Sequence, residues 1–334
     1  MVLLERKIVL LLNAYNSDRI FAEKDLARLK ELGKVVKNLD FDGPTSERAK
    51  ELIVGADAVV TSWYCPALEK DLLDLAPNLR VVAHAAGSVK YVVTNELFAG
   101  GIKVTTCSES LGIGVAETAL ALTITSLKNM WFLSQETRRG GWRNGRDAIR
   151  ELYGITVGVV GAGKAGRHYI KLLQNFDVEI LLSDPTLSDE EAQALGTTLV
   201  ELEELIKRSD VISIHAPSIP ETRHMFNSKN LPLMKDRAIL INTARGALID
   251  EEALVAELRT GRIFAAIDVT DPEPPLLDHP FRTLPNVVLL PHIAGAVNNG
   301  LMRMGAHVAS ELERFFAGEE LTTEVKKEQL ASLA

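Results

Sequence analysis

Cysteine is scarce in this sequence. Cys65 and Cys107 are the two cysteines among 334 residues, and neither has a companion at the spacing of a metal site. This scarcity argues against a secreted domain held together by disulfides and favours a reduced, cytoplasmic compartment. Both cysteines are predicted to be ordinary packing residues, and no bound metal is expected.

Excess positive charge and long apolar runs are also lacking. Lys and Arg number 37 against 45 Asp and Glu, so the formal net charge of −8 argues against a nucleic-acid partner. Because no stretch of about 18 uninterrupted apolar residues is present, no membrane partner is expected. The first apolar run, Ile8 to Leu12, is too short for a signal-peptide core and is typical of a first strand.

The remaining composition is that of a globular protein. Hydrophobic residues make up 46% and charged residues 25% of the chain, which are ordinary globular values. A chain of this length exceeds one ordinary core, so two domains of about 100 to 200 residues each are expected. No repeat period or low-complexity segment is found.

The region from residue 153 to 185 has the pattern of one βαβ unit with a phosphate-binding turn inside it. An apolar, β-branched run leads directly into the motif GAGKAG at 161–166. Gly161 allows the tight turn, Gly163 lets the backbone approach a pyrophosphate, and Gly166 lets helix and strand pack closely. A dinucleotide site is therefore predicted, with a structural glycine turn or another nucleotide-like ligand as the alternatives.

The segments after the glycine motif support a dinucleotide. A helix is predicted from Arg167 to Phe176, with its N-terminus facing the anion. A second strand, Val178 to Leu182, leads to Asp184, where an acidic side chain would accept hydrogen bonds from a ribose 2′-hydroxyl. Since a 2′-phosphate would be repelled there, NAD is favoured over NADP.

The rest of the chain alternates strands and helices. From residue 7 to about 107 this alternation predicts a parallel sheet covered on both faces, without a glycine fingerprint for a dinucleotide. Residues 115–138 are interpreted as one long helix crossing between domains, whose apolar face serves either a dimer or the subunit interior. A final amphipathic helix, 301–316, is expected to pack on the first domain, and the residues after Gly318 are interpreted as a loose tail.

Unusual polar residues follow the strands of the second half. In an open parallel sheet the carboxyl ends of the strands converge on the ligand crevice, so these residues are candidates for the site. They are Asp184, His215, Thr243, Arg245, Asp268 and His292.

Taken singly, some of these candidates have a structural interpretation as well. His215 has two interpretations that the sequence does not separate: it caps the end of a strand, or it belongs to the ligand site. Arg245 has a planar fork that can hold a carboxylate by two parallel hydrogen bonds. Glu273 lies in a proline-rich segment where a solvated turn carboxylate is the alternative. His292 has the apolar neighbours Pro291 and Ile293, which suggest a partly buried imidazole.

Together these motifs resemble the D-isomer-specific 2-hydroxyacid dehydrogenase family. The resemblance rests on the glycine motif with Asp184, NTARG at 242–246, DVTDPEP at 268–274 and PHIAG at 291–295, and it covers nearly the whole chain. It implies two doubly wound parallel-sheet α/β domains, with a Rossmann NAD-binding domain inserted in a flavodoxin-like substrate domain. The implied boundaries are 1–107 with 299–334 for the substrate domain and 108–298 for the NAD domain.

The resemblance also implies a role for each matching residue. Arg245 would hold the substrate carboxylate and C2 oxygen, His292 would be the acid/base, and Glu273 would orient His292 and favour its protonated form. Residues implied at the cofactor are Gly161, Gly163, Lys164, Ala165, Gly166, Asp184, His215, Pro217, Thr222, Thr243, Ala244, Asp268 and Gly295. Residues implied at the substrate are His84, Gly87, Ser88 and Arg245.

Two departures from the family pattern bear on the substrate. Many members carry Arg-Ala-Gly-Val-Gly where this chain has HAAGS at 84–88, and Lys90 stands where an aspartate is frequent. The changed side chains are compatible with a larger or more polar 2-keto acid, such as a sugar-derived acid. Ile219 replaces a frequent threonine at the cofactor rim, and we have no interpretation of that change.

The implied activity is hydride transfer between NAD and a small 2-keto or D-2-hydroxy acid, in a homodimer formed through the NAD domain. The alternative from another class is an NAD-sensing, dehydrogenase-like corepressor, which can retain the same residues. The absence of a basic surface and of long tails lowers its weight. A methyltransferase built on the glycine turn would not explain Arg245 or His292.

Overall fold

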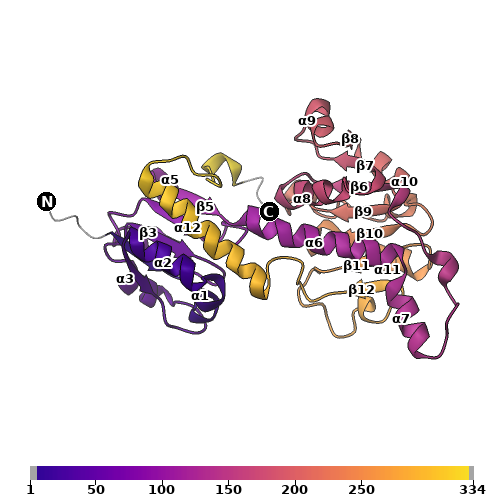
Figure 1. Ribbon diagram of the computed structural model, residues 1–334, viewed down its shortest axis with the longest axis horizontal. Helices are drawn as coiled ribbons and strands as arrows, with labels where there is room; N and C mark the ends of the chain where they lie inside the picture. Colours follow the sequence, from indigo (N-terminus) through magenta and orange to yellow (C-terminus); the bar gives the residue numbers. More distant parts are fainter. Residues whose placement is uncertain (1–5, 331–334) are drawn as a thin grey trace. The chain divides into compact units, whose positions relative to one another are not determined.

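The computed structural model describes residues 6–330, so the outermost parts of the predicted substrate domain, 1–5 and 331–334, lie outside the described residues. The chain forms two compact units (Figure 1). The first contains the described residues up to Leu111 together with those from Ala296 onward, and the second contains Gly112–Gly295.

The first unit is built on a five-stranded parallel sheet of order β2-β1-β3-β4-β5. This is the flavodoxin-like strand order, so the predicted fold class of the unit is confirmed. The strands are β1 (Lys7–Leu10), β2 (Lys34–Lys37), β3 (Ala58–Thr61), β4 (Val81–His84) and β5 (Lys103–Thr106).

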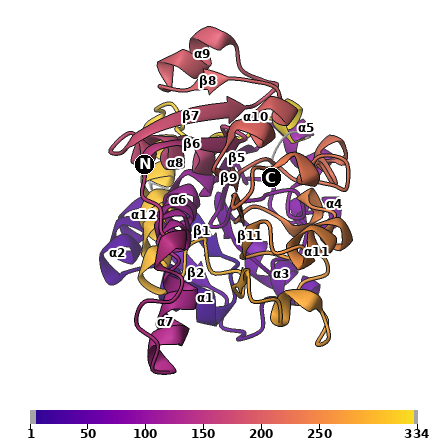
Figure 2. The same ribbon diagram turned by 90° about the vertical axis from the view of Figure 1, so that its right-hand side faces the viewer.

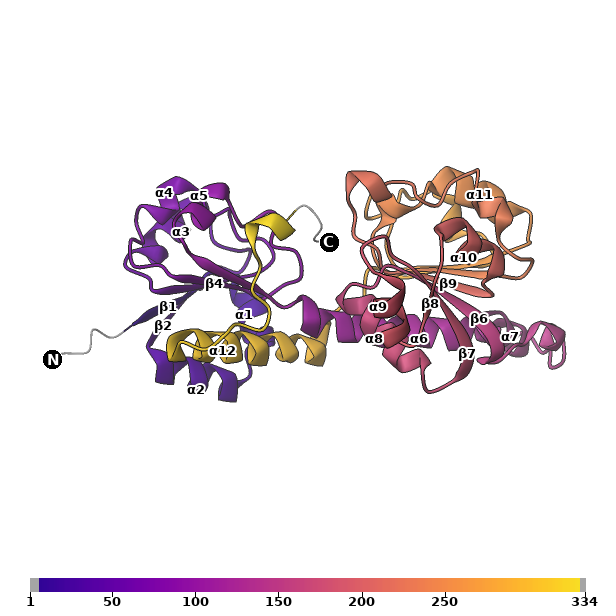
Figure 3. The same cartoon turned by 90° about the horizontal axis from the view of Figure 1, so that it is seen from above.

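Helices cover both faces of this sheet because both faces of its strands are apolar. Ile8 and Leu10 of β1 face one core, which α2 and α12 close, whereas Val9 faces the other core under α3, α4 and α5 (Figure 3). The helices are α1 (Ala14–Ile20), α2 (Glu23–Leu32), α3 (Ser46–Ile53), α4 (Lys70–Leu73), α5 (Asn95–Ala99) and α12 (Met302–Ala317).

The C-terminal part of the chain packs on the first unit, as predicted for its helix but not for its tail. α12 lies beside α2 (Figure 1). The prediction of a loose tail after Gly318 was wrong, because Leu321 and Val325 are buried and the Val325 amide donates to the Val104 carbonyl oxygen. Buried Glu311 of α12 also accepts hydrogen bonds from the Thr322 and Thr323 amides.

The second unit contains a seven-stranded parallel sheet of order β12-β11-β10-β9-β6-β7-β8. The order reverses between β6 and β9, which is the crossover of a Rossmann fold, and β8 and α9 lie beyond β7 at one edge (Figure 2). The strands are β6 (Tyr153–Val160), β7 (Asp177–Ser183), β8 (Thr198–Leu199), β9 (Val211–Ile214), β10 (Ile239–Asn242), β11 (Phe264–Ile267) and β12 (Val287–Leu289).

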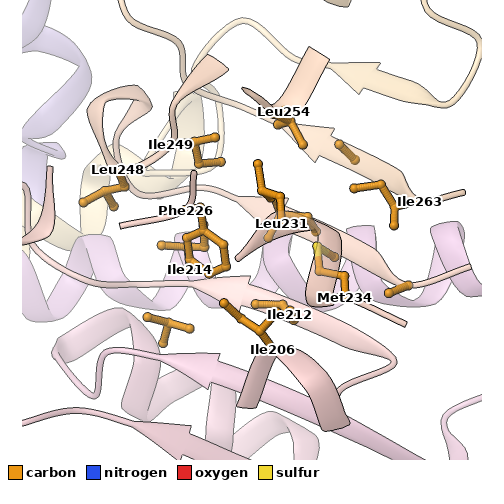
Figure 4. Packing of buried hydrophobic residues seen from close by; sticks show 14 of the residues in the cluster. Ile206, Ile212, Ile214, Phe226, Leu231, Met234, Leu248, Ile249, Leu254 and Ile263 are labelled. Carbon is orange, nitrogen blue, oxygen red and sulfur yellow. The ribbon is translucent and has the colours of Figure 1, made fainter. Parts of the chain in front are cut away.

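The faces of this sheet are covered by separate sets of helices. α10 and α11 pack on one face over a core that includes Phe226, Leu231 and Leu254 (Figure 4), and α6 and α8 pack on the other. The helices are α6 (Ser108–Leu127), α7 (Met130–Arg138), α8 (Lys164–Leu173), α9 (Asp189–Ala194), α10 (Leu202–Arg208) and α11 (Glu251–Arg259).

The predicted single helix over 115–138 is two helices. α6 runs from Ser108 in the first unit to Leu127 in the second, as a crossing helix would, but Asn129 has a φ of 51° and separates it from α7. Asparagine tolerates this left-handed conformation, which an α-helix cannot continue through.

Among the described residues, α6 alone is long and apolar enough to span a membrane by length and composition. One such helix is weak support for a membrane span, because a core helix passes the same test. Ala116, Ala119 and Leu122 of α6 are buried in the core of the second unit.

Candidate active site

Two of the three motif glycines are required by the protein chain itself. Gly161 follows β6 with a φ of 93°, and a Cβ there would lie 2.7 Å from the Ala216 nitrogen. A Cβ on Gly166 would lie 2.1 Å from the Gly161 carbonyl oxygen. Gly163 differs, because a Cβ on it would meet no atom within 4 Å. The open space at Gly163 is what the close approach of a phosphate requires.

The N-terminus of α8 follows this turn directly. The helix begins at Lys164 and ends at Leu173, three residues before the predicted Arg167 and Phe176, because Gly163 already occupies the N-cap position. The N-cap residue Gly163 has no side chain that could cap the helix, and the positive end of the helix dipole lies at this turn. Arg167 braces the turn by donating from Nε to the Ala162 carbonyl oxygen at 2.8 Å.

Asp184 follows β7 and faces the glycine turn. Its Oδ2 accepts the Ala162 amide at 2.7 Å, and its Oδ1 accepts the Thr186 amide at 2.9 Å and hydroxyl at 2.6 Å. The carboxylate therefore fixes the turn as well as standing where an acidic residue is expected to meet a ribose.

His215 and Thr243 follow β9 and β10 and are both buried. His215 Nδ1 and Thr243 Oγ1 have no hydrogen-bond partner in the protein, whereas His215 Nε2 lies 2.9 Å from the Ser213 hydroxyl oxygen. Burial lowers the pKa of His215 to about 3, so its imidazole is neutral at pH 7. Two buried, unpartnered polar atoms at the strand ends fit a polar ligand in the crevice.

Other predicted cofactor residues form the turns around these strand ends. The Thr222 hydroxyl donates to the Pro217 carbonyl oxygen at 2.6 Å and closes the turn after β9. The Ala244 amide donates to Asn242 Oδ1 at 3.0 Å, which fixes the turn after β10. A Cβ on Gly114 of α6 would lie 3.2 Å from the Gly295 carbonyl oxygen, so helix and turn are in close contact.

His292 and Glu273 form a direct contact. His292 Nδ1 lies 2.6 Å from Glu273 Oε1, and the two side chains are 46% and 42% exposed. The expectation of a partly buried imidazole was wrong, because the apolar neighbours of His292 do not cover its ring. The contact with Glu273 uses Nδ1 of the ring and not Nε2.

Asp268 holds His292 in place, a role that the sequence did not reveal. Its carboxylate accepts the Ile293 and Ala294 amides, both at 2.8 Å, and its carbonyl oxygen accepts the His292 amide at 2.9 Å. Because His292 has a φ of 52°, its backbone needs this support.

Arg245 lies within electrostatic reach of Glu273. Surrounding protein lowers the pKa of Arg245, and the charge of Glu273 opposes that decrease. Its guanidinium donates to the Ala244 carbonyl oxygen at 2.6 Å. The second unit therefore brings Arg245, Glu273 and His292 together.

The other predicted substrate residues, His84, Gly87 and Ser88, lie in the first unit. His84 ends β4 and is buried, with Nδ1 2.9 Å from the Thr61 hydroxyl oxygen. Burial lowers the pKa of His84 to about 4, opposed by a hydrogen bond with the Ser88 backbone, so a neutral imidazole stands where many family members carry arginine. Gly87 and Ser88 are partly exposed, and the Gly87 carbonyl oxygen accepts the Thr106 hydroxyl at 2.5 Å.

Comparison with known proteins identifies the family. Residues 120–294 match the model of the D-isomer specific 2-hydroxyacid dehydrogenase NAD-binding domain. The chain belongs to the D-isomer specific 2-hydroxyacid dehydrogenase family. NAD is accordingly its cofactor, and the family prediction is confirmed.

The names of similar dehydrogenases in this family refer to different acids. A glyoxylate reductase from Thermofilum pendens is 35% identical over 93% of this chain and 94% of its own. A D-3-phosphoglycerate dehydrogenase from Methanocaldococcus jannaschii is 34% identical over 87% of this chain, which spans only 55% of that relative. The structure of an acyclic imino acid reductase with NADPH and D-Arg has a TM-score of 0.79 at 25% identity, covering 96% of this chain and all of its own.

The dehydrogenase site fits its cofactor by its own geometry. The space at Gly163 and the uncapped N-terminus of α8 suit a pyrophosphate, and His215 Nδ1 and Thr243 Oγ1 offer buried polar atoms. Sequence reasoning missed Gly112 of α6, where a Cβ would lie 3.0 Å from the Ala165 nitrogen at the start of α8. An isolated glycine within an apolar helix carries no signal of such a contact.

Proposed function

We propose that this protein is an NAD-dependent oxidoreductase that interconverts a 2-keto acid and a D-2-hydroxy acid. The observation that carries the proposal is the 2.6 Å contact of His292 Nδ1 with Glu273 Oε1, together with the charge interaction between Glu273 and Arg245. A base with an orienting carboxylate and a nearby cation is the set that reduction of a carboxylated carbonyl compound needs.

Each of the three residues has a defined role in the proposed reaction. When bound, NADH would supply the hydride in reduction, and NAD⁺ would accept it in oxidation. His292 gives a proton from Nε2 to the substrate oxygen in reduction and takes it back in oxidation. Glu273 accepts the Nδ1 hydrogen and so fixes the ring orientation. Arg245 binds the substrate carboxylate with its fork and stabilises charge that develops on the C2 oxygen.

We further propose the binding residues. Gly163 and the α8 amides from Lys164 to Gly166 take the pyrophosphate, and Asp184 takes the ribose. His84, Gly87 and Ser88 contribute to the substrate side. Gly161, His215, Pro217, Thr222, Thr243, Ala244, Asp268 and Gly295 complete the proposed cofactor site.

The relatives support a small acid substrate without selecting one. One is named for glyoxylate and another for 3-phosphoglycerate, so activity on either is a proposal for this chain. The neutral, buried His84 in place of a frequent arginine favours a pocket that differs from the common one.

We also propose a homodimer formed through the second unit. Met130, Trp131 and Phe132 of α7 are 49%, 39% and 41% exposed, which is a cluster of large apolar side chains on one short helix. Charge substitution at Trp131 is expected to change the sedimentation coefficient from that of a dimer to that of a monomer. The buried, unpaired Cys65 and Cys107 support the proposed cytoplasmic location.

A substrate panel tests the proposed function. NADH oxidation is measured against glyoxylate, pyruvate, hydroxypyruvate, 3-phosphohydroxypyruvate and longer, branched, aromatic and sugar-derived 2-keto acids. We expect turnover of at least one acid, with the D-hydroxy acid as product. NADH binding without turnover of any acid would contradict the proposal and point to the NAD-sensing alternative.

A further inference from the structure

A largely buried acid–histidine contact lies outside the three proposed catalytic residues. Glu251 is the first residue of α11, and its side chain is only 13% exposed. Its Oε1 accepts the Asp271 amide at 2.9 Å, and its Oε2 lies 3.1 Å from His279 Nε2. The next residue of the same helical turn, Glu252, is exposed to solvent.

The hydrogen-bond partners of His279 assign its tautomer. His279 Nδ1 accepts the Phe281 amide at 3.3 Å, so Nε2 carries the hydrogen and donates it to Glu251. The ring also packs edge-on against buried Phe281, with 4.5 Å between ring centroids. Glu251 therefore accepts one hydrogen bond from each end of the segment Asp271–His279.

This segment carries Glu273, the partner of His292. Only Pro272 separates the Asp271 amide, which Glu251 holds, from Glu273. The Thr270 hydroxyl donates to the Pro272 carbonyl oxygen at 2.9 Å and tightens the same stretch. Glu251 thus holds the backbone two residues before Glu273.

The turn that carries Arg245 rests on the same stretch of backbone. A Cβ on Gly246 would lie 2.1 Å from the Thr270 carbonyl carbon and 2.5 Å from the Asp271 nitrogen. Any shift of the Thr270–Asp271 peptide would therefore move the turn that carries Arg245 as well as the segment that carries Glu273.

We propose that Glu251 and His279 are positioning residues that hold the Glu273 segment, and through it the Glu273–His292 contact, in the geometry for proton transfer. The proposal rests on the function proposed above. It assigns to α11 a task in catalysis through its N-terminal carboxylate, since small displacements of catalytic groups strongly reduce rates.

The ionisation of the pair agrees with this task. Burial raises the pKa of Glu251 to about 7; the Asp271 amide lowers it and the Asp271 charge raises it. Burial and the Arg282 charge lower the pKa of His279, which the Asp278 charge opposes. Above pH 7 the contact is thus a hydrogen bond from a neutral imidazole to a carboxylate, rather than an ion pair.

The test compares Glu251→Ala and Glu251→Gln with the matched control Glu252→Ala at pH 8. For the best acid of the panel we expect Glu251→Ala to lower kcat about tenfold or more, with KM and the NADH dissociation constant within twofold of wild type. Glu251→Gln should restore most of kcat, because its amide oxygen can still accept the Asp271 amide. Glu252→Ala should match the wild type.

Amide hydrogen exchange over 270–279 gives a readout that does not depend on turnover. Exchange should be faster in Glu251→Ala and unchanged in Glu252→Ala. If wild type reduces no acid, this exchange difference still supports the positioning role while the proposed reaction fails.

Two results would overturn the inference. One is unchanged kcat and unchanged exchange in Glu251→Ala, and the other is a loss of kcat that Glu251→Gln does not restore. If Glu251→Ala does not fold, His279→Leu decides the question, because it removes one donor and leaves the Asp271 contact intact. A wild-type kcat in His279→Leu with unchanged exchange would then contradict the proposal.

Discussion

Replacing Gly163 with alanine should weaken NADH binding without unfolding the protein. The added Cβ meets no atom within 4 Å, and the backbone angles of −67° and −169° are open to alanine. Replacing a glycine lowers the conformational entropy of the unfolded chain, which stabilises the folded protein by about 0.4 to 1 kcal/mol. Alanine is a poorer N-cap residue than glycine by a similar amount, which offsets this gain. The free energy of unfolding should therefore stay within about 1 kcal/mol of wild type.

The effect on NADH follows from the place of that Cβ. It would occupy the space beside the first amides of α8, where we propose that the pyrophosphate binds. Displacing a phosphate from those donors should raise the NADH dissociation constant at least about tenfold, which corresponds to about 1.4 kcal/mol.

Gly166→Ala is the matched comparison. Its Cβ would lie 2.1 Å from the Gly161 carbonyl oxygen, so the glycine turn and α8 must separate. Overpacking of this kind destabilises by about 1 to 3 kcal/mol. Urea unfolding and NADH fluorescence titration of both variants separate the two effects. Wild-type NADH affinity in a stable Gly163→Ala protein would refute the assignment of the pyrophosphate to this turn.

Three further predictions concern substrate, cofactor and pH. Arg245→Ala should raise KM for the acid and lower kcat together, with NADH affinity retained; steady-state kinetics that show only one of these changes would count against its role. Wild type should prefer NADH to NADPH because of Asp184, and a clear NADPH preference in binding titrations would overturn that expectation. Burial raises the pKa of the Glu251 carboxyl group from 4.5 to about 7 in the folded protein. Protonation of Glu251 therefore stabilises the folded state below pH 4.5, and this contribution is lost as the pH rises from 4.5 to about 7. In urea unfolding, the free energy of unfolding of Glu251→Gln should therefore rise relative to that of wild type over this pH range, by at most about 3 kcal/mol. A difference that does not change with pH would disprove the shift in pKa.

Period and order in the sequence were enough to predict much of the fold. Continuous apolar runs separated by helical segments predict parallel sheets, and the glycine motif between strand and helix locates the Rossmann half. The structure confirms both sheets. Polar residues at the strand ends likewise pointed to the second-unit candidates, because parallel strands share one carboxyl edge.

Other features depend on contacts that no local pattern encodes. The break at Asn129 is a single left-handed residue inside an apolar stretch, so periodicity runs through it. The polar tail after Gly318 is held by Glu311 of the preceding helix and by pairing near Val104, which is far away in the sequence. The role of Asp268 follows from amides 25 and 26 residues away, which only the folded turn brings to its carboxylate.

The central claim is that His292 transfers the proton in reduction of a 2-keto acid. The most direct measurement is turnover of the best panel acid by His292→Ala, together with an NADH titration of the same protein. We predict a loss of kcat of about 10² to 10⁴-fold with an unchanged NADH dissociation constant. Wild-type turnover by His292→Ala would contradict the account.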